Sequence, residues 1–417
     1  MTINDNIKNN LERLNQNIIL NLLKDKKEED LKSLLLDLNK LDFNELEKLI
    51  NIIKNKKESI DVSESKIEKI NYIDEYTLSN EEKSNMLSIC ENELKNDSYA
   101  LITMAGGQGT RLGHKGPKGT FKLNLFGEEI SIFNIIANKI KEKNEKYNIN
   151  IPWYIMTSEE NNDETVKYFE DNNYFGLNKN DVVFFTQTSQ PMILEDGNIV
   201  LNEDYSIKYA SDGNGSIYKV LKDKKILDDM DNRNIKYTLI SSVDNILINV
   251  LDEIFLGLFI NSGLKMASKT VKKISPEERV GVFCKIDGKP SVIEYSELSE
   301  ELRYQTEPDG ELTYKDAHLM INLFTVDALK EIANTDLEYH LAHKKSDFIN
   351  SNEEFEIAEI ENSYKFEKFI FDSFKYLDDI LIVQGKREND FAPVKNKEGN
   401  DSPASAKELY ENYYNNI

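Results

Sequence analysis

The distribution of glycine constrains this chain more than any other feature of its sequence. No glycine occurs before Gly106, and four then follow closely at Gly106, Gly107, Gly109 and Gly113. They come directly after the apolar run 99–104, which is typical of a buried strand. Because glycine has no Cβ atom, such a loop lets backbone N–H groups approach a phosphate or a flat base. The sequence predicts a change of architecture near residue 97, where a strand leads into a ligand-binding loop.

The segment before this loop is predicted to be almost entirely helical over residues 1–95. Leucine and isoleucine recur at three- to four-residue spacing in three stripes, at 11–23, 31–38 and 46–53. Asp42 lies in a stretch that can cap the third helix. The charged run 24–30 is interpreted as a solvated turn or helix face, and no residue of the segment suggests chemistry.

The remainder of the chain alternates between short apolar runs and amphipathic stretches. Strands are expected at 153–156, 182–185, 237–240 and 280–284, and helices at 132–140 and 254–260. This alternation is typical of an α/β layer with a largely parallel sheet. The last part combines a strand-like run at 380–383 with a polar tail from Asn396. We therefore expect a helical N-terminal region (1–95), a central α/β domain (96–335) and a C-terminal domain (336–417).

Composition argues against several classes of protein. Lysine and arginine number 52 against 75 aspartates and glutamates, a formal net charge of −23, which argues against gripping a nucleic-acid backbone. No apolar stretch approaches the ~18 residues of a membrane helix, and the start of the chain lacks the apolar region of a secretory signal. Two cysteines, Cys90 and Cys284, make no disulfide or metal framework and fit a reducing cytosol. We expect a cytoplasmic protein that binds neither nucleic acid nor membrane.

Two cations accompany the glycines, because Arg111 and Lys118 lie on the same loop. A polyphosphate is their natural target, since charge must be neutralised as a P–O bond breaks. The segment is not a dinucleotide fingerprint, because Leu112 occupies the place of the third glycine and Pro117 interrupts the helix. It is not a Walker loop either, since no register supplies that motif. A purely structural turn, the remaining alternative, would not need two cations beside four glycines.

Nine blocks in the same order resemble the eukaryotic-type UDP-sugar pyrophosphorylases, and among them most of all the UDP-N-acetylglucosamine pyrophosphorylases. They are the loop 105–113 with 117–119, then 153–158, 184–187 with Pro191, 212–215, 243–245, 280–282, 292–297, 368–372 and 387–395. The likeness covers roughly residues 97–403. It implies a Rossmann-like, GT-A-like nucleotidyltransferase domain with a helical N-terminal region and a small C-terminal domain.

The resemblance also implies roles for individual residues. Arg111 and Lys118 would be catalytic, Asp244 would bind a metal, and Lys395 would meet phosphate. The other positions would contact the nucleotide (Ala105, Gly106, Gly107, Gln187, Gly213) or the sugar (Asn214, Gly281, Glu294, His318, Phe369, Phe371). Structural alternatives are open: Gln187 as an exposed strand end, the two phenylalanines as core, and Lys395 as a surface lysine.

Two of these assignments also have a chemical basis. Gln187 carries a donor and an acceptor on one side chain, which suits the imide edge of uracil. Asp244 follows the expected strand at its carboxyl end, where α/β sheets place their ligands. A single carboxylate beside triphosphate fits Mg²⁺ (or Mn²⁺), although a helix cap or a turn is the alternative for Asp244 without the resemblance.

The implied reaction transfers the uridylyl group of UTP to an N-acetylhexosamine 1-phosphate, giving the UDP-sugar (UDP-N-acetylglucosamine in the first instance) and pyrophosphate. The sugar phosphate is already ionised at pH 7, so in-line attack needs neither a general base nor a covalent intermediate. Two alternatives are open: glucose or galactose 1-phosphate as the acceptor, and a non-catalytic UDP-sugar-binding protein. Retention of Arg111 and Lys118 speaks against the second. The sequence leaves the preferred sugar and the oligomeric state open.

His318 departs from the family pattern. Aligned on Phe324-Thr325, it occupies the place of a sugar-contacting asparagine. A neutral imidazole still offers one donor and one acceptor, so we expect His318 to help set the choice of sugar, with a core histidine beside a strand as the alternative. His340 and His343 have i, i+3 spacing and are interpreted as an ordinary helix surface, because no carboxylate or cysteine at suitable spacing completes a metal site.

Overall fold

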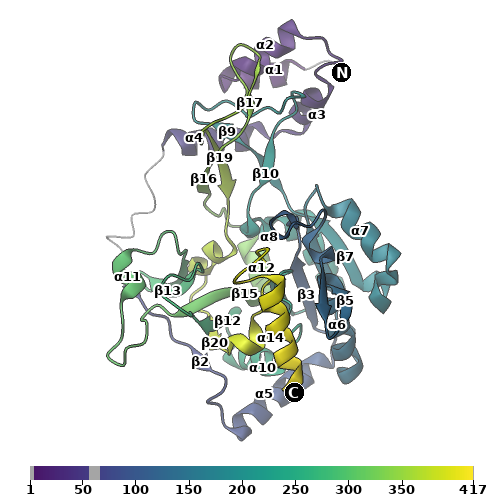
Figure 1. The fold of residues 1–417 in the computed structure, drawn as a ribbon, viewed down its shortest axis with the longest axis vertical. Coiled ribbons are helices and arrows are strands. Elements are labelled where there is room, and N and C mark those ends of the chain that lie inside the picture. The colour runs from purple at the N-terminus through teal and green to yellow at the C-terminus, as the bar shows by residue number, and fades with distance from the viewer. Residues whose placement is uncertain (1–3, 56–65, 417) are drawn as a thin grey trace. The chain divides into compact units, whose positions relative to one another are not determined.

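The computed structural model describes residues 4–55 and 66–416 and groups the chain into two compact units (Figure 1). The first unit comprises the described residues within 1–62 together with Thr188–Ser216 and Leu337–Phe369. The second comprises those within 63–187, 217–336 and 370–417. The three domains expected from the sequence follow chain order, whereas each compact unit is assembled from three separated segments.

The first unit contains the expected N-terminal helices among its described residues: α1 (Asp5–Arg13), α2 (Asn17–Asp25), α3 (Lys32–Lys40) and α4 (Phe43–Lys54). The second and third predicted stripes coincide with α3 and α4, whereas the first, 11–23, is interrupted at residues 14–16 and divided between α1 and α2. Asp42 caps α4 by accepting the N–H groups of Asn44 and Glu45, as expected. The leucines of these helices form one apolar core with distant side chains such as Ile193 and Phe366. The strands of this unit are β8 (Ser189–Pro191), β9 (Ile193–Leu194), β10 (Tyr209–Ser211), β16 (His340–Lys344), β17 (Phe348–Ile349), β18 (Phe355–Glu356) and β19 (Ser363–Glu367).

The interpretation of His340 and His343 as a helix surface is wrong. Both lie in β16, which pairs with β19, so their odd spacing puts them on opposite faces of the strand. His343 stacks on Tyr364 with ring centroids 4.8 Å apart, and His340 packs against Phe369. Across the described part of the chain there is no group of three or more side chains suited to hold a metal.

One mixed sheet organises the second unit. Among the described residues its order is β2-β20-β12-β15-β11-β3-β6-β7, with β1, β13 and β14 joined to it at β15. The run β11, β3, β6 and β7 is parallel, whereas β15 is antiparallel to both β11 and β12. This arrangement confirms the α/β class. The strands are β1 (Ile67–Glu68), β2 (Ile73–Asp74), β3 (Tyr99–Met104), β6 (Trp153–Thr157), β7 (Val182–Thr186), β11 (Tyr237–Ser242), β12 (Met266–Lys272), β13 (Val282–Ile286), β14 (Lys289–Ile293), β15 (Asp316–Thr325) and β20 (Leu381–Gln384), beside the hairpin β4 (Lys122–Leu125) and β5 (Glu128–Ser131).

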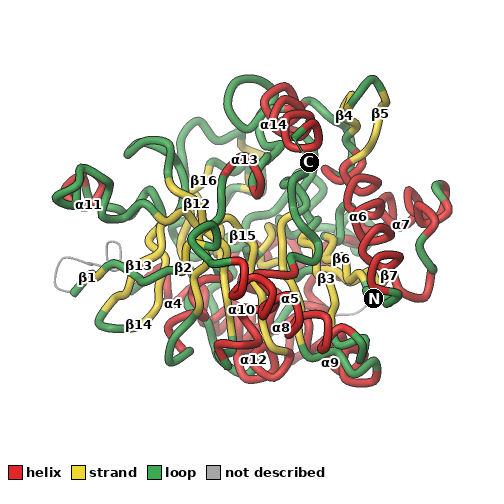
Figure 2. The backbone as a smooth tube through the Cα atoms, turned by 90° about the horizontal axis from the view of Figure 1, so that it is seen from below, coloured by secondary structure: helices red, strands yellow, loops and turns green. Residues whose placement is uncertain are grey.

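Helices cover this sheet, and in Figure 2 α8, α10 and α12 lie along one side of the row of strands. The close approach of α5 to α10 depends on Gly257, where a Cβ atom would lie 2.2 Å from the carbonyl oxygen of Met86. The helices of the second unit are α5 (Asn80–Leu94), α6 (Ile132–Tyr147), α7 (Asn162–Asp171), α8 (Ile217–Asp223), α9 (Ile226–Asn232), α10 (Glu253–Ser262), α11 (Glu300–Tyr304), α12 (Val326–Ile332), α13 (Arg387–Asp390) and α14 (Pro403–Asn415).

Two segments differ from the sequence-based expectation. Residues 67–68 and 73–74 form strands rather than helix, because they pair with β13 and β20. Each strand is two residues long, so no periodicity could indicate it. The polar tail contains helix α14, which begins at a capping box between Ser402 and Ser405 and buries Ala406.

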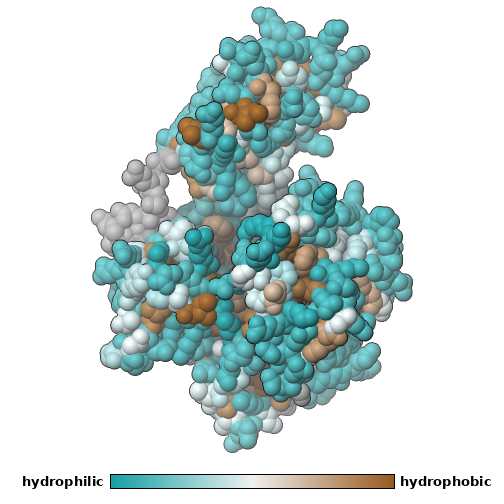
Figure 3. All heavy atoms as spheres, viewed as in Figure 1, coloured by the Kyte–Doolittle hydropathy of each residue, from teal (hydrophilic) through white to brown (hydrophobic). Residues whose placement is uncertain are grey.

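The surface agrees with the acidic, polar composition. On the face shown in Figure 3, hydrophilic residues predominate and hydrophobic ones appear in small separate patches. Of the helices in the described part of the chain, none combines the length and the apolar character needed to cross a membrane.

Candidate active site

Three of the expected elements meet at one edge of the sheet in the second unit. β3 lies between β11 and β6, and Met104 at its end pairs with Ser242 and with Met156. The loop 105–120 follows β3, Asp244 follows β11, and Gln187 follows β7. Parallel strands present their carboxyl-terminal loops on the same edge. The topology therefore brings the glycine-rich loop, Asp244 and Gln187 to one place.

The loop 105–120 is closed on itself by backbone hydrogen bonds. The N–H group of Lys118 donates to the carbonyl of Gly107 at 3.1 Å, and that of Gly109 donates to the carbonyl of Gly116 at 3.0 Å. Two short 3₁₀ turns, Thr110–Leu112 and Lys118–Thr120, replace a regular helix. Lys118 is thus held on a defined turn, not on a flexible linker.

Sequence reasoning missed two residues that hold this loop. The buried side chain of Asn161 donates to the carbonyl of Ala105 at 3.0 Å. His114 Nε2 lies 2.8 Å from the hydroxyl of Thr120, and because that hydroxyl donates to the carbonyl of Pro117, we assign the proton to Nε2. The available signal for Asn161 was its place just after a strand, the same signal that pointed to Asp244.

Gly106 and Gln187 are in direct contact. A Cβ atom on Gly106 would lie 2.8 Å from Cδ and Nε2 of Gln187 and 2.9 Å from Oε1, so the carboxamide lies against the backbone of residue 106. The backbone N–H group of Gln187 donates to the carbonyl of Thr157 at 2.8 Å. A Cβ atom on Gly107 would meet nothing within 4 Å. Two residues expected to contact the nucleotide, Gly106 and Gln187, are therefore neighbours, and a third, Gly107, faces open space.

Asp244 is a buried anion paired with Lys118. Its Oδ2 lies 3.3 Å from Nζ of Lys118, and only 12% of its side chain is exposed. Burial favours the neutral acid, but Lys118 and Lys395 outweigh burial and lower the pKa of Asp244 below its usual value. The carboxylate is therefore ionised at neutral pH.

The segment that carries Lys395 runs beside the residues that follow β11. The N–H group of Val394 donates to the carbonyl of Asp244 at 2.9 Å. The ammonium of Lys395 lies 3.9 Å from Oδ2 of Asp401, and 40% of the Lys395 side chain is exposed. Arg111 on the loop is exposed as well and makes no ion pair within the described residues. Both cations are thus accessible to an anionic ligand.

The donor set around Asp244 fits a hard divalent cation that substrate helps to hold. Mg²⁺ is usually bound by one or two carboxylates together with phosphate oxygens and waters. Asp244 supplies one ionised carboxylate beside the glycine-rich loop, and the described residues contain no cluster able to hold a metal by themselves. The arrangement fits Mg²⁺ shared with phosphate and not a metal centre built from protein alone.

A second group of expected residues lies together where β13, which also pairs with β14, meets β15. The N–H group of His318 donates to the carbonyl of Gly281 at 2.9 Å. A Cβ atom on Gly281 would lie 2.8 Å from Cγ1 of Val292 and 3.2 Å from Oε1 of Glu294. Gly281, Glu294 and His318 are therefore neighbours, although 37 residues of chain separate the first from the last.

Aromatic rings surround the imidazole of His318. Its ring centroid lies 5.3 Å from that of Phe283, 5.8 Å from that of Phe371 and 5.9 Å from that of Phe374. Nε2 lies 3.3 Å from the carboxamide of Asn322. Burial lowers the pKa of His318 to about 4, so the ring is neutral at physiological pH.

The remaining expected residues, Gly213, Asn214 and Phe369, belong to the first unit. Gly213 has a φ of +87°, and a Cβ atom there would lie 2.3 Å from the carbonyl oxygen of Lys368. Backbone packing therefore requires glycine at this position whether or not a ligand binds. The nucleotide and sugar roles of these three residues stay predictions.

Comparison with known proteins places the chain. A family model described as UTP–glucose-1-phosphate uridylyltransferase matches residues 42–412. The chain belongs to this family. The match spans the loop, Asp244, the His318 neighbourhood and Lys395, and it confirms the family resemblance carried by the nine blocks.

Members of the family, and solved structures, resemble the chain closely. UDP-N-acetylhexosamine pyrophosphorylase-like protein 1 of Xenopus tropicalis is 36% identical over 335 residues, which are 77% of this chain and 65% of that protein. UDP-N-acetylglucosamine diphosphorylase 2 of Arabidopsis thaliana is 38% identical over 328 residues, 74% of this chain and 64% of that protein. The chain thus spans just under two thirds of these relatives. The structure of the uridine diphosphate N-acetylglucosamine pyrophosphorylase from Trypanosoma brucei, in complex with inhibitor, superposes with a TM-score of 0.82 at 28% identity and covers 98% of this chain and 85% of that one.

Proposed function

We propose that this family member transfers the uridylyl group of UTP to N-acetylglucosamine 1-phosphate, giving UDP-N-acetylglucosamine and pyrophosphate. The observation that carries the proposal is the ionised Asp244 carboxylate, which is paired with Lys118 at the end of β11 beside the loop 105–120 and whose pKa Lys395 also lowers. The names of the Xenopus and Arabidopsis relatives support the N-acetylhexosamine part.

The protein's part in this reaction would be mainly to position the two substrates and to supply positive charge. The sugar phosphate is an anion at neutral pH and attacks the α-phosphorus in line, so no side chain needs to remove a proton. Lys118, Arg111 and Lys395 would stabilise the charge that develops on the departing pyrophosphate. Mg²⁺ (or Mn²⁺), when bound at Asp244, would neutralise further phosphate charge.

The nucleotide would bind over the open backbone at Gly107. The carboxamide of Gln187 already lies against Gly106 and offers a donor and an acceptor to the edge of uracil. Asn161 Nδ2 donates to the carbonyls of Ala105 and Gly107 at 3.0 Å and 3.4 Å. These two residues would provide backbone groups to the base or the phosphates.

The sugar would bind near Gly281 and Glu294, because Oε1 of Glu294 lies against the backbone of Gly281. The carboxylate of Glu294 would accept hydrogen bonds from sugar hydroxyls, and the neutral ring of His318 would supply a further polar contact. Phe371 would offer an apolar surface to the acyl group, because it lies against the ring of His318.

A second candidate keeps the chemistry and changes the acceptor. The matching family model is described as UTP–glucose-1-phosphate uridylyltransferase, so glucose 1-phosphate is the alternative substrate. A non-catalytic UDP-sugar-binding protein is a more distant candidate, which the accessible Arg111 and the Lys118–Asp244 pair argue against.

Pyrophosphate release from UTP tests these candidates. The purified chain is assayed with N-acetylglucosamine, N-acetylgalactosamine, glucose and galactose 1-phosphates, each with added Mg²⁺ and with excess chelator. We expect the highest kcat/KM with N-acetylglucosamine 1-phosphate and loss of turnover in chelator. Preference for glucose 1-phosphate would favour the second candidate, and absence of pyrophosphate release with every sugar 1-phosphate would reject the proposal of an enzyme.

A cytoplasmic location is proposed as well, since Cys90 and Cys284 are free, buried thiols.

A further inference from the structure

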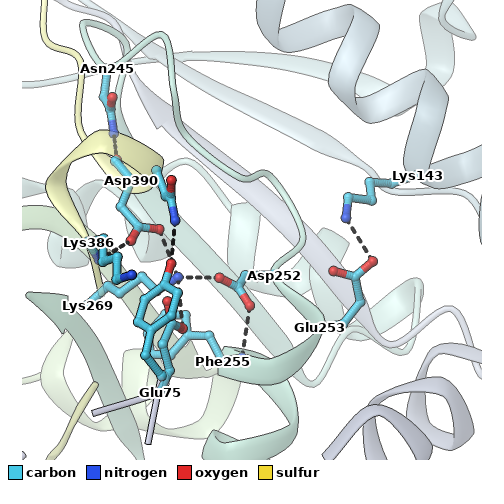
Figure 4. Close-up of polar contacts among 11 residues, drawn as sticks. Glu75, Lys143, Asn245, Asp252, Glu253, Phe255, Lys269, Lys386 and Asp390 are labelled. Carbon is cyan, nitrogen blue, oxygen red and sulfur yellow. Dashed lines mark hydrogen bonds and ion pairs between the residues drawn. The ribbon is translucent and has the colours of Figure 1, made fainter. Parts of the chain in front are cut away.

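Lys269 on β12 lies at the centre of a buried ionic cluster, called here the Lys269 cluster, that includes Glu75, Asp252 and Asp390 (Figure 4). Its Nζ lies 2.8 Å from Oδ1 of Asp390 and 3.3 Å from Oε2 of Glu75, and it also contacts Asp252. Only 4% of the Lys269 side chain is exposed. A charge buried this deeply is costly unless its partners are held in place, so the cluster ties together chain segments that are distant in sequence.

The cluster contains more carboxylates than one ammonium can neutralise. Burial raises the pKa of Glu75 to about 7 and raises the pKa of Asp390 above its usual value. Burial opposes the charge of Lys269, but the carboxylates outweigh it and raise the pKa of that ammonium. Lys269 is therefore the constant positive charge around which the three acids are arranged.

Asp390 connects this cluster to the candidate active site. Its backbone carbonyl accepts a hydrogen bond from Nδ2 of Asn245 at 2.7 Å, and Oδ1 of Asn245 accepts one from the N–H group of Ala392 at 2.9 Å. The next contact along the segment is the bond from Val394 N–H to the carbonyl of Asp244 at 2.9 Å. Residues 390–394 are thus bound along residues 244–246, and Lys395 follows immediately.

The side chain of Asp390 determines where this segment begins. Its Oδ2 accepts the N–H group of Lys386 at 3.0 Å while its Oδ1 binds Lys269. A Cβ atom on Gly385 would lie 2.1 Å from Oδ2 of Asp390, so the chain leaves room for that carboxylate with a glycine. Glu75 binds Lys269 too, but among the described residues it makes no hydrogen bond with residues 390–395.

We infer that Lys269 and Asp390 are positioning residues for the proposed uridylyl transfer, because their ion pair holds the segment 390–395 against residues 244–246 and so sets Lys395 beside Asp244. The inference rests on the proposed function for the role of Lys395. It adds a pair of residues that lie behind the site and act through another residue instead of touching substrate.

A double-mutant cycle in the full-length chain tests this inference. Asp390→Asn removes the charge that binds Lys269 and keeps the size of the side chain, while Lys395→Ala removes the group that it positions. We expect each single variant to lower kcat/KM for UTP at least tenfold. The double variant should be no worse than Lys395→Ala alone, within about twofold. Independent, multiplicative losses would overturn the inference, because a residue that only stabilises the fold would act whether or not Lys395 is present.

Glu75→Gln is the matched control, since it also removes one carboxylate from Lys269 but leaves the link to Asn245 untouched. We expect its kcat/KM to stay within about twofold of wild type; a loss equal to that of Asp390→Asn would overturn the inference. Where Asp390→Asn is not recovered folded, Lys269→Arg takes its place in the cycle, because it keeps the charge and displaces the donor atoms.

A measurement without turnover separates this inference from the proposed function. Hydrogen exchange at the amides of Ala392 and Val394 is compared between Asp390→Asn and Glu75→Gln. We expect exchange at least tenfold faster in Asp390→Asn, and equal rates would overturn the inference. If wild type releases no pyrophosphate with any sugar 1-phosphate, the proposed function fails, and the exchange experiment still decides whether the ion pair holds the segment.

Discussion

The ammonium of Lys118 lies 3.3 Å from the carboxylate of Asp244, so the cation expected to face the leaving phosphate is paired with the expected metal ligand. The side chains are 16% and 12% exposed. Removing one member of a largely buried ion pair leaves the other charge uncompensated and lowers stability, whereas removing an exposed cation changes stability little. Substitution of Lys118 is therefore expected to change the stability of the folded protein as well as the rate of the reaction.

Alanine substitutions of Arg111 and Lys118 separate these effects. We expect each variant to lower kcat at least 10²-fold with nearly unchanged UDP-sugar binding, because both charges act on the leaving group. Only Lys118→Ala should also lower the unfolding temperature, since Arg111 makes no ion pair within the described residues. Steady-state kinetics, product titration and thermal unfolding measure the three quantities. A kcat near that of wild type would remove the residue concerned from the mechanism.

The stability loss in Lys118→Ala should depend on pH. Against the effect of burial, Lys118 helps to lower the pKa of Asp244 in the folded protein. A carboxyl group with a lowered folded-state pKa contributes stability above its usual pKa, and that contribution is lost as the pH falls through the lowered value. The difference in unfolding free energy between wild type and Lys118→Ala should therefore be full at pH 7 and shrink below about pH 4. A difference that grows on acidification would contradict the pairing.

Asp244→Asn addresses the metal. We expect loss of Mg²⁺-dependent turnover, because the amide is a much weaker ligand for a hard cation. The unfolding temperature should fall less than in Lys118→Ala, since Lys118 is the less buried member of the pair and its long side chain can turn its ammonium toward solvent. Rates are measured across a Mg²⁺ titration. Normal rates at low millimolar Mg²⁺ would show that Asp244 is not the ligand.

Local signals account for the parts of the fold that the sequence predicted. The glycine-rich loop follows the buried run 99–104, and the leucine stripes appear as helices α1 to α4, because both patterns are complete within a few residues. Asp244 was predicted from the family resemblance and from its place after a strand, and Gln187 from the resemblance and from the donor and acceptor of its carboxamide. His340 and His343 lie in a strand and not on a helix surface. Two histidines alone do not establish the periodicity that distinguishes a strand from a helix.

Long-range pairing accounts for what the sequence could not predict. Lys269 and Asp390 are separated by 121 residues, and neither lies in a pattern that points to the other. The grouping of the N-terminal helices with Ile193 and Phe366 likewise depends on contacts across most of the chain. Such pairs become visible only when the sheet order is known, because β12 and β20 are neighbours in the sheet and not in sequence.

Gly106→Ala tests the contact between the loop and Gln187. A Cβ atom at residue 106 overlaps the carboxamide of Gln187 at 2.8 Å, whereas one at residue 107 meets nothing within 4 Å. We expect Gly106→Ala to displace Gln187 and to lower the unfolding temperature of the unliganded protein by a few degrees, as an overpacked site does. Gly107→Ala should leave that temperature unchanged.

The two glycine variants should behave alike only when nucleotide is present. Both are expected to raise the KM for UTP, Gly106→Ala through the displaced carboxamide and Gly107→Ala through the space that the nucleotide would occupy. Calorimetry without ligand and kinetics with UTP give the two readouts. An unchanged KM in Gly107→Ala would place the nucleotide elsewhere.

His318→Asn tests the choice of sugar. The backbone N–H group of His318 donates to the carbonyl of Gly281, and the imidazole is neutral at assay pH because burial lowers its pKa to about 4. We expect the ratio of kcat/KM between gluco- and galacto-configured 1-phosphates to shift by roughly 5- to 150-fold, as one hydrogen-bonding change is worth about 1–3 kcal/mol. The KM for UTP should stay within about twofold.

The same variant should also change how stability responds to acid. A histidine with a lowered folded-state pKa contributes stability above its usual pKa of 6.5, and that contribution is lost as the pH falls toward 4. His318→Asn should therefore lose less stability than wild type between pH 6.5 and pH 4, measured by denaturant unfolding. His343→Asn makes the same chemical change in the first unit and should leave the sugar ratio as it is in wild type. An unchanged ratio in His318→Asn would place His318 outside the sugar pocket and weaken the assignment of an N-acetylhexosamine substrate.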